Sequence, residues 1–215
     1  PIQLATIASD QIPLWYKQKL NNYNFGPGVF KVDFALNDPI PWKNKNCLKA
    51  STVHIGGSFE EIAQSEKEAW EGKQSEKPFV MLSQQSQFDS TRATKGKHTG
   101  WAYCHIPNGS SKDMTQSIEK QIERFAPGFK DTMLAKSSMS HKDFQRYKPD
   151  YLRGAITGGS ADITKLFTSP VARINPYSTP NPDLFICSAS TPPGGGVHGM
   201  CGFYAAKSVL RSIQN

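Results

Sequence analysis

The sequence lacks most of the signatures that assign a function directly. No apolar run approaches the roughly 20 residues that a membrane-spanning helix requires. The five histidines show no metal-ligand spacing such as H-x-x-x-H, so no metal site is expected. The cysteines form no C-x-x-C pair, which indicates neither a zinc ribbon nor a thioredoxin-like redox site. The cysteines are Cys47, Cys104, Cys187 and Cys201.

Signals for export and for nucleic-acid binding are missing as well. The first residues, PIQLATIASDQIPLW, have no basic segment and include Asp10, so they do not form a secretory signal. With no disulfide pattern, we expect free thiols and a cytoplasmic location. No basic helix or aromatic-basic motif of a known nucleic-acid reader is present, and no nucleic acid is expected as a partner.

Positively charged residues are in excess. The 25 Lys and Arg residues outnumber the 18 Asp and Glu residues, giving a net charge of +7. The positive residues are scattered, which is typical of a solvated surface. Attraction to anionic lipid headgroups, with peripheral contact to a membrane, is the alternative.

The most informative stretch runs from Asp183 to Ile213. Leu184 to Cys187 is a short apolar run suited to a buried strand. Ser188 to Val197 follows and contains mainly small residues, two prolines and three consecutive glycines. From Gly199 onward the apolar residues recur at helical spacing. The order is therefore strand, glycine loop, helix.

This order suits a large anionic cofactor, a nucleotide or a flavin. Glycines let the backbone approach a ligand closely, and the first turn of a helix presents free N–H groups and the positive end of its dipole. Gly194, Gly196 and Gly199 satisfy G-x-G-x-x-G, but no second strand follows the helix, so a dinucleotide βαβ unit does not close. No Lys-Ser or Lys-Thr follows the glycines at the spacing that a P-loop requires, which excludes a P-loop. A tight glycine turn without a ligand remains the alternative.

The motif TPPGGGVHGMCGFYAA, with the apolar run before it, resembles the C-terminal flavin-contacting motif of phytoene dehydrogenase-like flavoproteins, the group of carotenoid desaturases and isomerases. Within that group the chain is most similar to the pyridine nucleotide-disulfide oxidoreductase domain-containing protein 2 branch. Supporting stretches are GPGVFKVDFALNDPIPW, TVHIGGSFEEI, GKHTGWAYCHIPNG and IERFAPGF.

The resemblance implies an FAD-dependent oxidoreductase that transfers hydride to or from an apolar substrate such as a polyene. It also implies an N-terminal Rossmann segment that holds the adenine and pyrophosphate of FAD, and no such segment is recognised in this sequence. We therefore expect residues 1–175 to be part of a substrate-binding (cap) domain and residues 176–215 to be the flavin-contacting strand-loop-helix. Alone, the chain is expected to be inactive and to bind FAD weakly. A homodimer is a further expectation.

The same resemblance implies the cofactor-binding residues. The loop would line the ribityl and pyrophosphate side of the flavin, and the start of the helix would point at its N1 and C2 carbonyl. Many related flavoproteins carry an acidic residue after the strand, whereas this chain has Ser188-Ala189-Ser190, which argues against an amine oxidase. No catalytic residue is assigned. The cofactor-binding residues expected are Ser188, Ala189, Ser190, Gly194, Gly195, Gly196, Val197, His198, Gly199 and Met200.

The rest of the chain predicts an α+β fold, with a mixed, mostly antiparallel sheet flanked by helices. Alternating or short apolar runs predict the strands, and apolar residues at helical spacing predict the helices. In the helix that begins at Ser58, we expect Phe59, Ile62, Ala63, Ala69 and Trp70 on the buried side. The predicted strands are 29–36, 51–55, 79–82, 98–106 and 132–135, and the predicted helices are 11–22, 58–72, 113–125 and 142–147, with a helical turn at 162–167.

One of these strands carries a candidate substrate surface. Alternation over 98–106 places Trp101, Tyr103 and His105 on one face of the strand. By the resemblance, this face would wall the cavity of an extended apolar substrate. Packing of the same face on the helix 113–125 is the alternative.

Two other functions remain open. His198 and Cys201 are three residues apart, and a cysteine in a first helical turn can act as a nucleophile when its pKa is lowered. A small thiol packed in the interior is the simpler interpretation. The chain as a whole also fits a non-catalytic lipid- or protein-binding domain.

Overall fold

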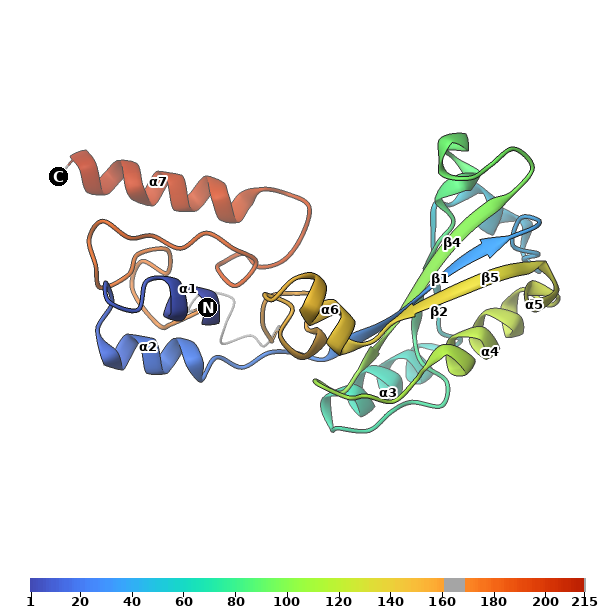
Figure 1. The fold of residues 1–215 in the computed structure, drawn as a ribbon, viewed down its shortest axis with the longest axis horizontal. Helices are drawn as coiled ribbons and strands as arrows, with labels where there is room; N and C mark the ends of the chain where they lie inside the picture. The colour runs from blue at the N-terminus through green and yellow to red at the C-terminus, as the bar shows by residue number, and fades with distance from the viewer. Residues whose placement is uncertain (161–168, 215) are drawn as a thin grey trace. The chain divides into compact units, whose positions relative to one another are not determined.

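The computed structural model describes residues 1–160 and 169–214, and it divides into two compact units (Figure 1). The sheet unit is the continuous segment Pro27–Gly154. The terminal unit combines Pro1–Gly26 with Ala155–Asn215, so it is built from both ends of the chain. The predicted helical turn at 162–167 lies outside the described residues.

The sheet unit contains a five-stranded antiparallel sheet in the order β2-β3-β4-β1-β5. The long strands β1 and β4 pair over their whole length, from Gly28 opposite Ile106 to Leu36 opposite His98. This confirms the predicted α+β class with an antiparallel sheet. The strands are β1 (Gly28–Leu36), β2 (Thr52–Ile55), β3 (Val80–Ser83), β4 (His98–Ile106) and β5 (Met133–Met139).

The core of this unit lies on one face of the sheet. Successive side chains of a strand point to opposite faces, so every second residue of β1 enters the core. The core side chains from β1 and β4 pack against those of helix α4 (Thr115–Phe125) and the residue before it. The core residues of β1, of β4 and of the α4 region are Phe30, Val32, Phe34, Leu36, Ala102, Cys104, Ile106, Met114, Ile118 and Ile122.

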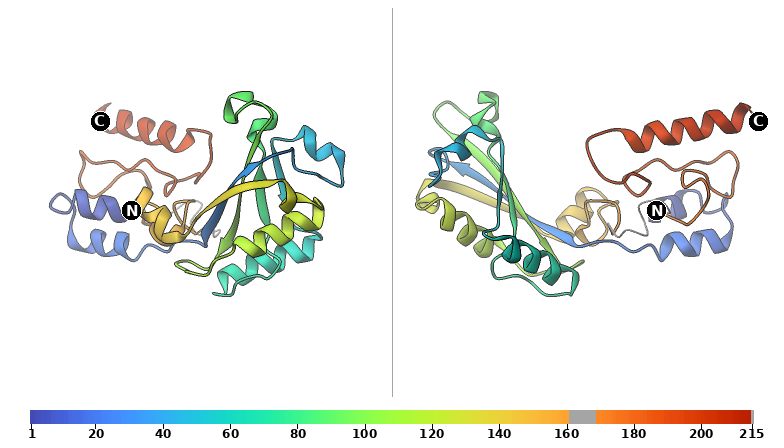
Figure 2. Two further views of the ribbon diagram at one scale, coloured as in Figure 1. Left: turned by 45° about the vertical axis from the view of Figure 1, so that its right-hand side comes forward. Right: turned by 180° about the vertical axis from the view of Figure 1, so that it is seen from behind.

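Helix α3 (Phe59–Trp70) lies beside α4, as Figures 1 and 2 show and as an ion pair between Glu61 and Arg124 confirms. The predicted start is confirmed, because Ser58 accepts a hydrogen bond from Glu61 N. The predicted buried face is wrong in part, since the side chains of Phe59 and Trp70 are 80% and 53% exposed.

Ser65, rather than a large apolar residue, marks the buried side of α3. Its hydroxyl accepts a hydrogen bond of 2.9 Å from Phe79 N, at the point where the chain approaches β3. A buried backbone N–H needs such a partner, so this bond fixes which side of the helix faces inward. Ala69, one turn later, is the other buried residue of the helix.

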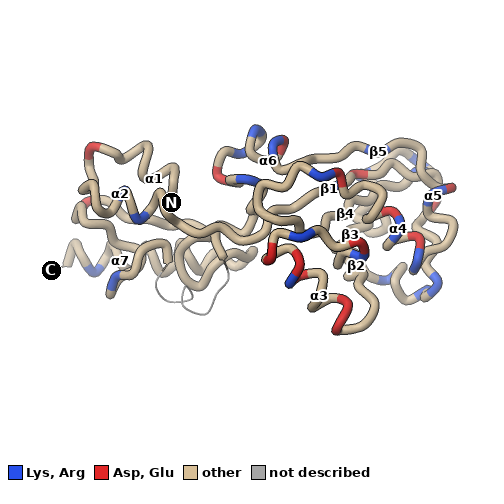
Figure 3. Tube along the Cα trace, turned by 90° about the horizontal axis from the view of Figure 1, so that it is seen from below, with Lys and Arg blue, Asp and Glu red and all other residues tan. Residues whose placement is uncertain are grey.

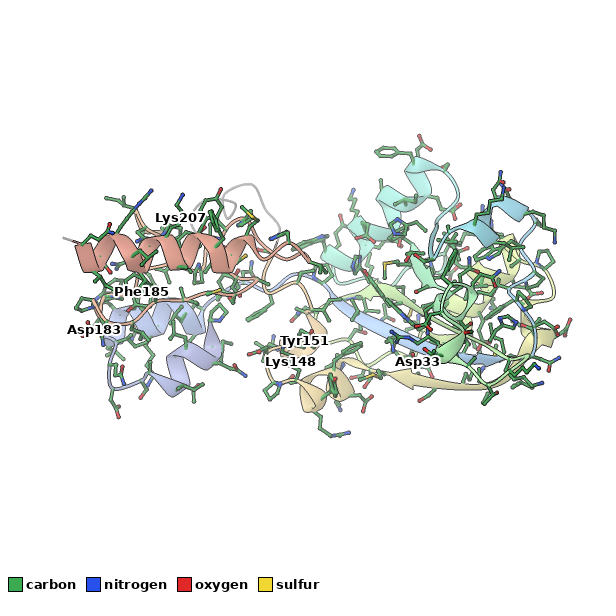
Figure 4. The ribbon with its side chains drawn as sticks, turned by 90° about the horizontal axis from the view of Figure 1, so that it is seen from above. Asp33, Lys148, Tyr151, Asp183, Phe185 and Lys207 are labelled. Carbon is green, nitrogen blue, oxygen red and sulfur yellow. The ribbon has the colours of Figure 1, made fainter. Side chains whose placement is uncertain are left out.

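After α4, a short helix α5 (Phe129–Thr132) leads into β5, which extends four residues beyond the predicted strand end at 135. Helix α6 (His141–Tyr147) follows, close to the predicted helix 142–147, and Ser140 and Asp143 form a reciprocal capping box at its start. Beyond α6, the Lys148 ammonium lies 5.1 Å from the centre of the Tyr151 ring (Figure 4). The remaining short helices of the unit are the 3-10 turns η1 (Lys45–Lys49), η2 (Gln85–Gln87), η3 (Ser90–Arg92) and η4 (Leu152–Gly154).

The terminal unit has a small core built largely by its two N-terminal helices. These are α1 (Ile2–Ile7), which the sequence did not predict, and α2 (Leu14–Asn21), which begins three residues after the predicted start. Val171, from the C-terminal part of the chain, packs into the same cluster. The other members are Ala5, Ile12, Tyr16 and Leu20.

The C-terminal helix is confirmed, and the strand predicted before the glycine loop is not. Helix α7 (Met200–Gln214) begins directly after Gly199. Over 184–187 only Phe185 forms a bridge, with Ser178. A strand needs a hydrogen-bonded neighbour along its length, and here the short return from 178 to 185 provides one bridge only.

The units do not follow the division predicted at residue 175, because residues 1–26 pack with the C-terminal part of the chain. The roles assigned to residues 1–175 and 176–215 stay predictions. Lys and Arg are spread over many elements among Asp and Glu, as Figure 3 shows. In the described part of the chain, no helix combines the length and the apolar character needed to cross a bilayer.

Candidate functional site

The glycine loop of the terminal unit is a chain of turns held by its own hydroxyl groups. Thr191 N donates to Ser188 O at 2.9 Å, and Gly194 N donates to Thr191 O at 2.9 Å. The Ser188 hydroxyl accepts from Ser190 N at 3.0 Å. Ser and Thr side chains stabilise such turns in preference to regular structure. Gly194 has φ +102°, which a residue with a side chain rarely adopts.

The start of α7 is closed in part by a side chain that the sequence assigned to the flavin. Met200 N donates a hydrogen bond of 3.0 Å to His198 Nδ1, and Phe203 N makes the first helical bond, to Gly199 O. His198 therefore acts as a cap for one of the free N–H groups of the helix. The dipole of the first turn remains, but fewer N–H groups are left for a ligand.

A pocket of about 460 Å³ lies beside the glycine loop. This is within the range of small-molecule sites. Four parts of the chain form its walls within the terminal unit: the end of the α2 region, residues 156–160, Ser169, and the loop 189–196. Its described lining residues are Tyr23, Ile156, Thr157, Gly159, Ser160, Ser169, Ala189, Ser190, Thr191, Pro192, Pro193, Gly194, Gly195 and Gly196.

Half of the predicted cofactor residues line this pocket and half do not. The structure brings Ala189, Ser190 and the three consecutive glycines to the wall. Val197 instead projects fully into solvent. The other predicted residues that lie outside the described lining are Ser188, His198, Gly199 and Met200.

The opposite wall, formed by residues 156–160, was not assigned by residue from the sequence. Its two glycines allow close approach: a Cβ on Gly158 would lie 2.8 Å from the Ala189 Cβ, and one on Gly159 would overlap the Tyr23 hydroxyl. The adjacent pair Gly158-Gly159 was the available signal. Tyr23 had none, because a single tyrosine after a helix carries no pattern.

The described lining residues include no charged side chain. The polar groups are hydroxyls and backbone atoms, and some are already used to join the walls: the Ser190 hydroxyl donates to Gly158 O at 2.5 Å. The Tyr23 and Ser169 hydroxyl oxygens lie 3.5 Å apart. A ligand here would be held by backbone and hydroxyl groups rather than by ion pairs.

Cys201 has a structural position. Its buried Sγ lies 3.2 Å from Gly194 O and 3.4 Å from Thr191 O, so the thiol contacts the carbonyls of the glycine loop. The ring of His198 bonds to Met200 N instead of to this sulfur. This arrangement favours the packed thiol over the nucleophile. Beside it, burial, with smaller contributions from the Cys201, Tyr204 and Cys187 side chains, raises the pKa of Tyr177.

A second cluster lies in the sheet unit, on the face of the sheet opposite the core. The rings of Trp101 and Tyr103 are nearly parallel, with centres 6.1 Å apart. Lys31 Nζ lies 5.5 Å from the Trp101 ring centre and pairs with Asp33. Helix α4 packs on the other face, so the alternative in which Trp101, Tyr103 and His105 pack on that helix is wrong.

The same face carries a carboxylate–imidazole pair. His105 Nδ1 and Glu66 Oε2 are 2.7 Å apart, with the two side chains 26% and 33% exposed. Glu66 comes from α3, and the sequence analysis did not single it out, because an acidic residue on a helix is ordinarily a surface charge. Burial, with a smaller contribution from the Glu66 charge, raises the pKa of Tyr103.

Known proteins are similar to this chain in structure and in sequence. No family model matches the chain. A crystal structure of an oxidoreductase from Methanosarcina mazei matches 98% of this chain with a TM-score of 0.52 and 14% identity, and the match covers 40% of that protein. At this identity the match shows the fold: an α+β oxidoreductase fold.

Two curated proteins are similar in sequence. Pyridine nucleotide-disulfide oxidoreductase domain-containing protein 2 from Mus musculus is 30% identical over 168 residues, and that from Rattus norvegicus is 29% identical over 166. Each match covers 72% of this chain, and the chain spans 28% of the length of these relatives. The predicted resemblance to this branch of oxidoreductases is confirmed.

Proposed function

We propose that this chain is the C-terminal part of an FAD-dependent oxidoreductase that transfers hydride to or from an apolar substrate such as a polyene. The observation that carries the proposal is the pocket beside the glycine loop, in a chain similar to an oxidoreductase. Bound flavin would supply the redox chemistry. The residues of this chain would bind and orient it.

The pocket fits part of a flavin by shape and by its donor set. Gly195 faces the opposite wall, where a Cβ would come within 3.3 Å of Thr157 O, so the absence of a side chain keeps the pocket open. Hydroxyls and backbone groups suit the uncharged ribityl chain and the ring edge. The first turn of α7 favours negative charge by about 0.3–1 kcal/mol, which is a modest contribution.

The test uses a full-length protein that contains this chain, because the chain spans 28% of the relatives' length. We expect such a protein to purify with a flavin absorption spectrum. Gly195→Glu should abolish flavin retention, since it places bulk and negative charge in the pocket. Gln18→Glu, the same charge on an exposed position of α2, is the matched control and should keep the flavin.

A colourless full-length protein would contradict the proposal and favour a non-catalytic lipid- or protein-binding domain. Full flavin retention by Gly195→Glu would contradict the placement of the cofactor. For the 215-residue chain alone we expect FAD binding weaker than about micromolar, that is, less than about 8 kcal/mol of binding free energy. Micromolar or tighter binding would show that the chain holds the cofactor without further segments.

A further inference from the structure

We infer that the outer face of the sheet, opposite the core, binds an apolar molecule through a hydroxyl group, with the Glu66–His105 pair as the polar anchor. The inference rests on the proposed function, whose apolar substrate the sequence analysis expects at the face of Trp101, Tyr103 and His105. It adds the polar group by which that substrate is recognised.

The apolar part of the site is a shelf made by four strands. The pairing registers place Met81 of β3, Tyr103 of β4, Lys31 of β1 and Met139 of β5 in one row across the sheet. Trp101 lies in the adjacent row, its ring nearly parallel to that of Tyr103. Two flat aromatic rings, with Met81 beside Tyr103 and Met139 beyond Lys31, offer contact area to an extended apolar chain without fixing its identity.

The polar end of the site lies beside His105 of β4, at a position before the first residue of β3. Val80 pairs with Cys104, so no residue of β3 stands beside His105, and Glu66 of α3 reaches the imidazole there. An ionised carboxylate only accepts hydrogen bonds, so His105 Nδ1 must donate to Glu66. In the neutral imidazole, Nε2 is then an acceptor.

The pair therefore selects the kind of polar group. Glu66 Oε1 is a further acceptor, buried and without a hydrogen-bond partner among the described residues. Two acceptors and one negative charge favour a hydroxyl donor and disfavour a carboxylate.

The neighbouring cation does not reverse this preference. Lys31 Nζ lies 2.5 and 2.7 Å from the two carboxylate oxygens of Asp33, so its charge is already paired (Figure 4 labels Asp33). Of the other groups in this row, His54 at the β2 edge is exposed, and its ring contacts the edge of Phe79. The charge that an incoming polar group meets at His105 is that of Glu66.

The experiment compares 1-octanol with octanoate as probes for the whole chain. Binding is followed by NMR of isotope-labelled protein, at a pH near 8 where an imidazole is ordinarily neutral. We expect octanol to shift the signals of Trp101, Tyr103 and His105 and to bind at least about tenfold more tightly than octanoate, as for one hydrogen bond to a charged group.

Glu66→Gln removes the charge and keeps the shape, so the preference for octanol should fall below about threefold. Glu60→Gln, at an exposed position of the same helix, is the matched control and should leave it unchanged. If Glu66→Gln does not fold, His105→Phe tests the same point, because it keeps a ring and removes the acceptor.

Equal or tighter binding of octanoate, a preference that survives Glu66→Gln, or no shift at the three β4 residues would each overturn the inference. The flavin spectrum of the full-length Glu66→Gln variant separates the two proposals. If the Glu66→Gln variant retains flavin and loses the preference for octanol, the result supports both the proposed function and this site. If a full-length protein without the substitution is colourless but still prefers octanol, the result supports this site without the redox function.

Discussion

Gln84 shows how much one polar side chain contributes inside the sheet unit. It is buried, its Nε2 donates to the carbonyls of Cys47 and Ala50 at 2.6 Å each, and its Oε1 accepts from Trp42 Nε1 at 3.0 Å. The loop between β1 and β2 also places Ile40 and Trp42 in the core, and the three hydrogen bonds of this amide tie Cys47 and Ala50 to the same core.

Gln84→Ala should lower the free energy of unfolding by about 2–4 kcal/mol, because the buried Trp42 Nε1 loses its acceptor and the Cys47 and Ala50 carbonyls each lose a donor. Urea unfolding followed by circular dichroism measures the change. Gln64→Ala, on the exposed surface of α3, should change stability by less than about 0.5 kcal/mol. Equal effects of the two substitutions would refute this role of Gln84.

Asp89 is the residue with the clearest dependence on pH. Hydrogen bonds from the Thr91 hydroxyl, from Arg92 and from Thr91 N lower the pKa of its carboxyl group from the usual 3.8 to about 2. The folded state therefore holds the proton less tightly than the unfolded state. The stabilisation is complete above the unfolded pKa and is lost as the pH falls from 3.8 towards 2.

We expect an NMR titration of the Asp89 carboxyl carbon to give a midpoint well below that of an unfolded peptide. The difference in unfolding midpoint between the native chain and Asp89→Asn should shrink as the pH falls below about 4. A carboxyl midpoint at the ordinary value would show that the cap at η3 is not formed in solution.

At the scale of residues, the sequence predicted part of the pocket lining, at the three consecutive glycines and at Ala189 and Ser190 before them. Gly194, Gly195 and Gly196 stand out because three consecutive glycines are informative. Tyr23 and Glu66 do not stand out, since their roles arise from contacts with segments far along the chain. Such contacts carry no local signal.

Among the elements, strands were predicted better than the faces of helices. The alternation in 29–36 and 98–106 reflects one buried and one open face, and both strands formed with every second residue in the core. In α3, apolar residues at both ends suggested a buried stripe, but a single hydrogen bond to Ser65 set the rotation. The run 184–187 is apolar, yet an apolar run becomes a strand only beside another strand.

This contrast predicts the effects of two substitutions. Leu82 of β3 is fully buried, so Leu82→Ala should destabilise the sheet unit by about 2–5 kcal/mol through lost contacts and a cavity. Phe59→Ala removes a larger side chain from the exposed end of α3 and should cost less than about 0.5 kcal/mol. Denaturant unfolding measures the change in the free energy of unfolding for both variants. A larger decrease for Phe59→Ala than for Leu82→Ala would support the buried side of α3 that was predicted from the sequence.

At the scale of the whole molecule, the two units differ in how they are encoded. The sheet unit is one continuous segment with its own core, whereas the terminal unit needs segments from both ends. The sequence did not predict this division, because the cluster around Tyr16 and Val171 joins residues more than a hundred positions apart.

We expect the segment 27–154, expressed alone, to fold and to unfold cooperatively, since its described core residues all lie within it. Removing residues 1–26 from the whole chain should leave the sheet unit folded and unfold the terminal unit, because Val171 loses the cluster it packs against. Amide NMR spectra report both outcomes. Retention of terminal-unit signals in the shortened chain would contradict the assignment of its core.

The discontinuity of the terminal unit also sets an order of events during biosynthesis. The helices of residues 1–26 are translated before the sheet unit, but the residues of 155–215 that pack with them are translated only after it. Tyr16, Leu20 and their neighbours are thus exposed in the nascent polypeptide while the sheet unit is being made. A chaperone that binds short apolar segments would find its target there, ahead of the sheet unit rather than behind it.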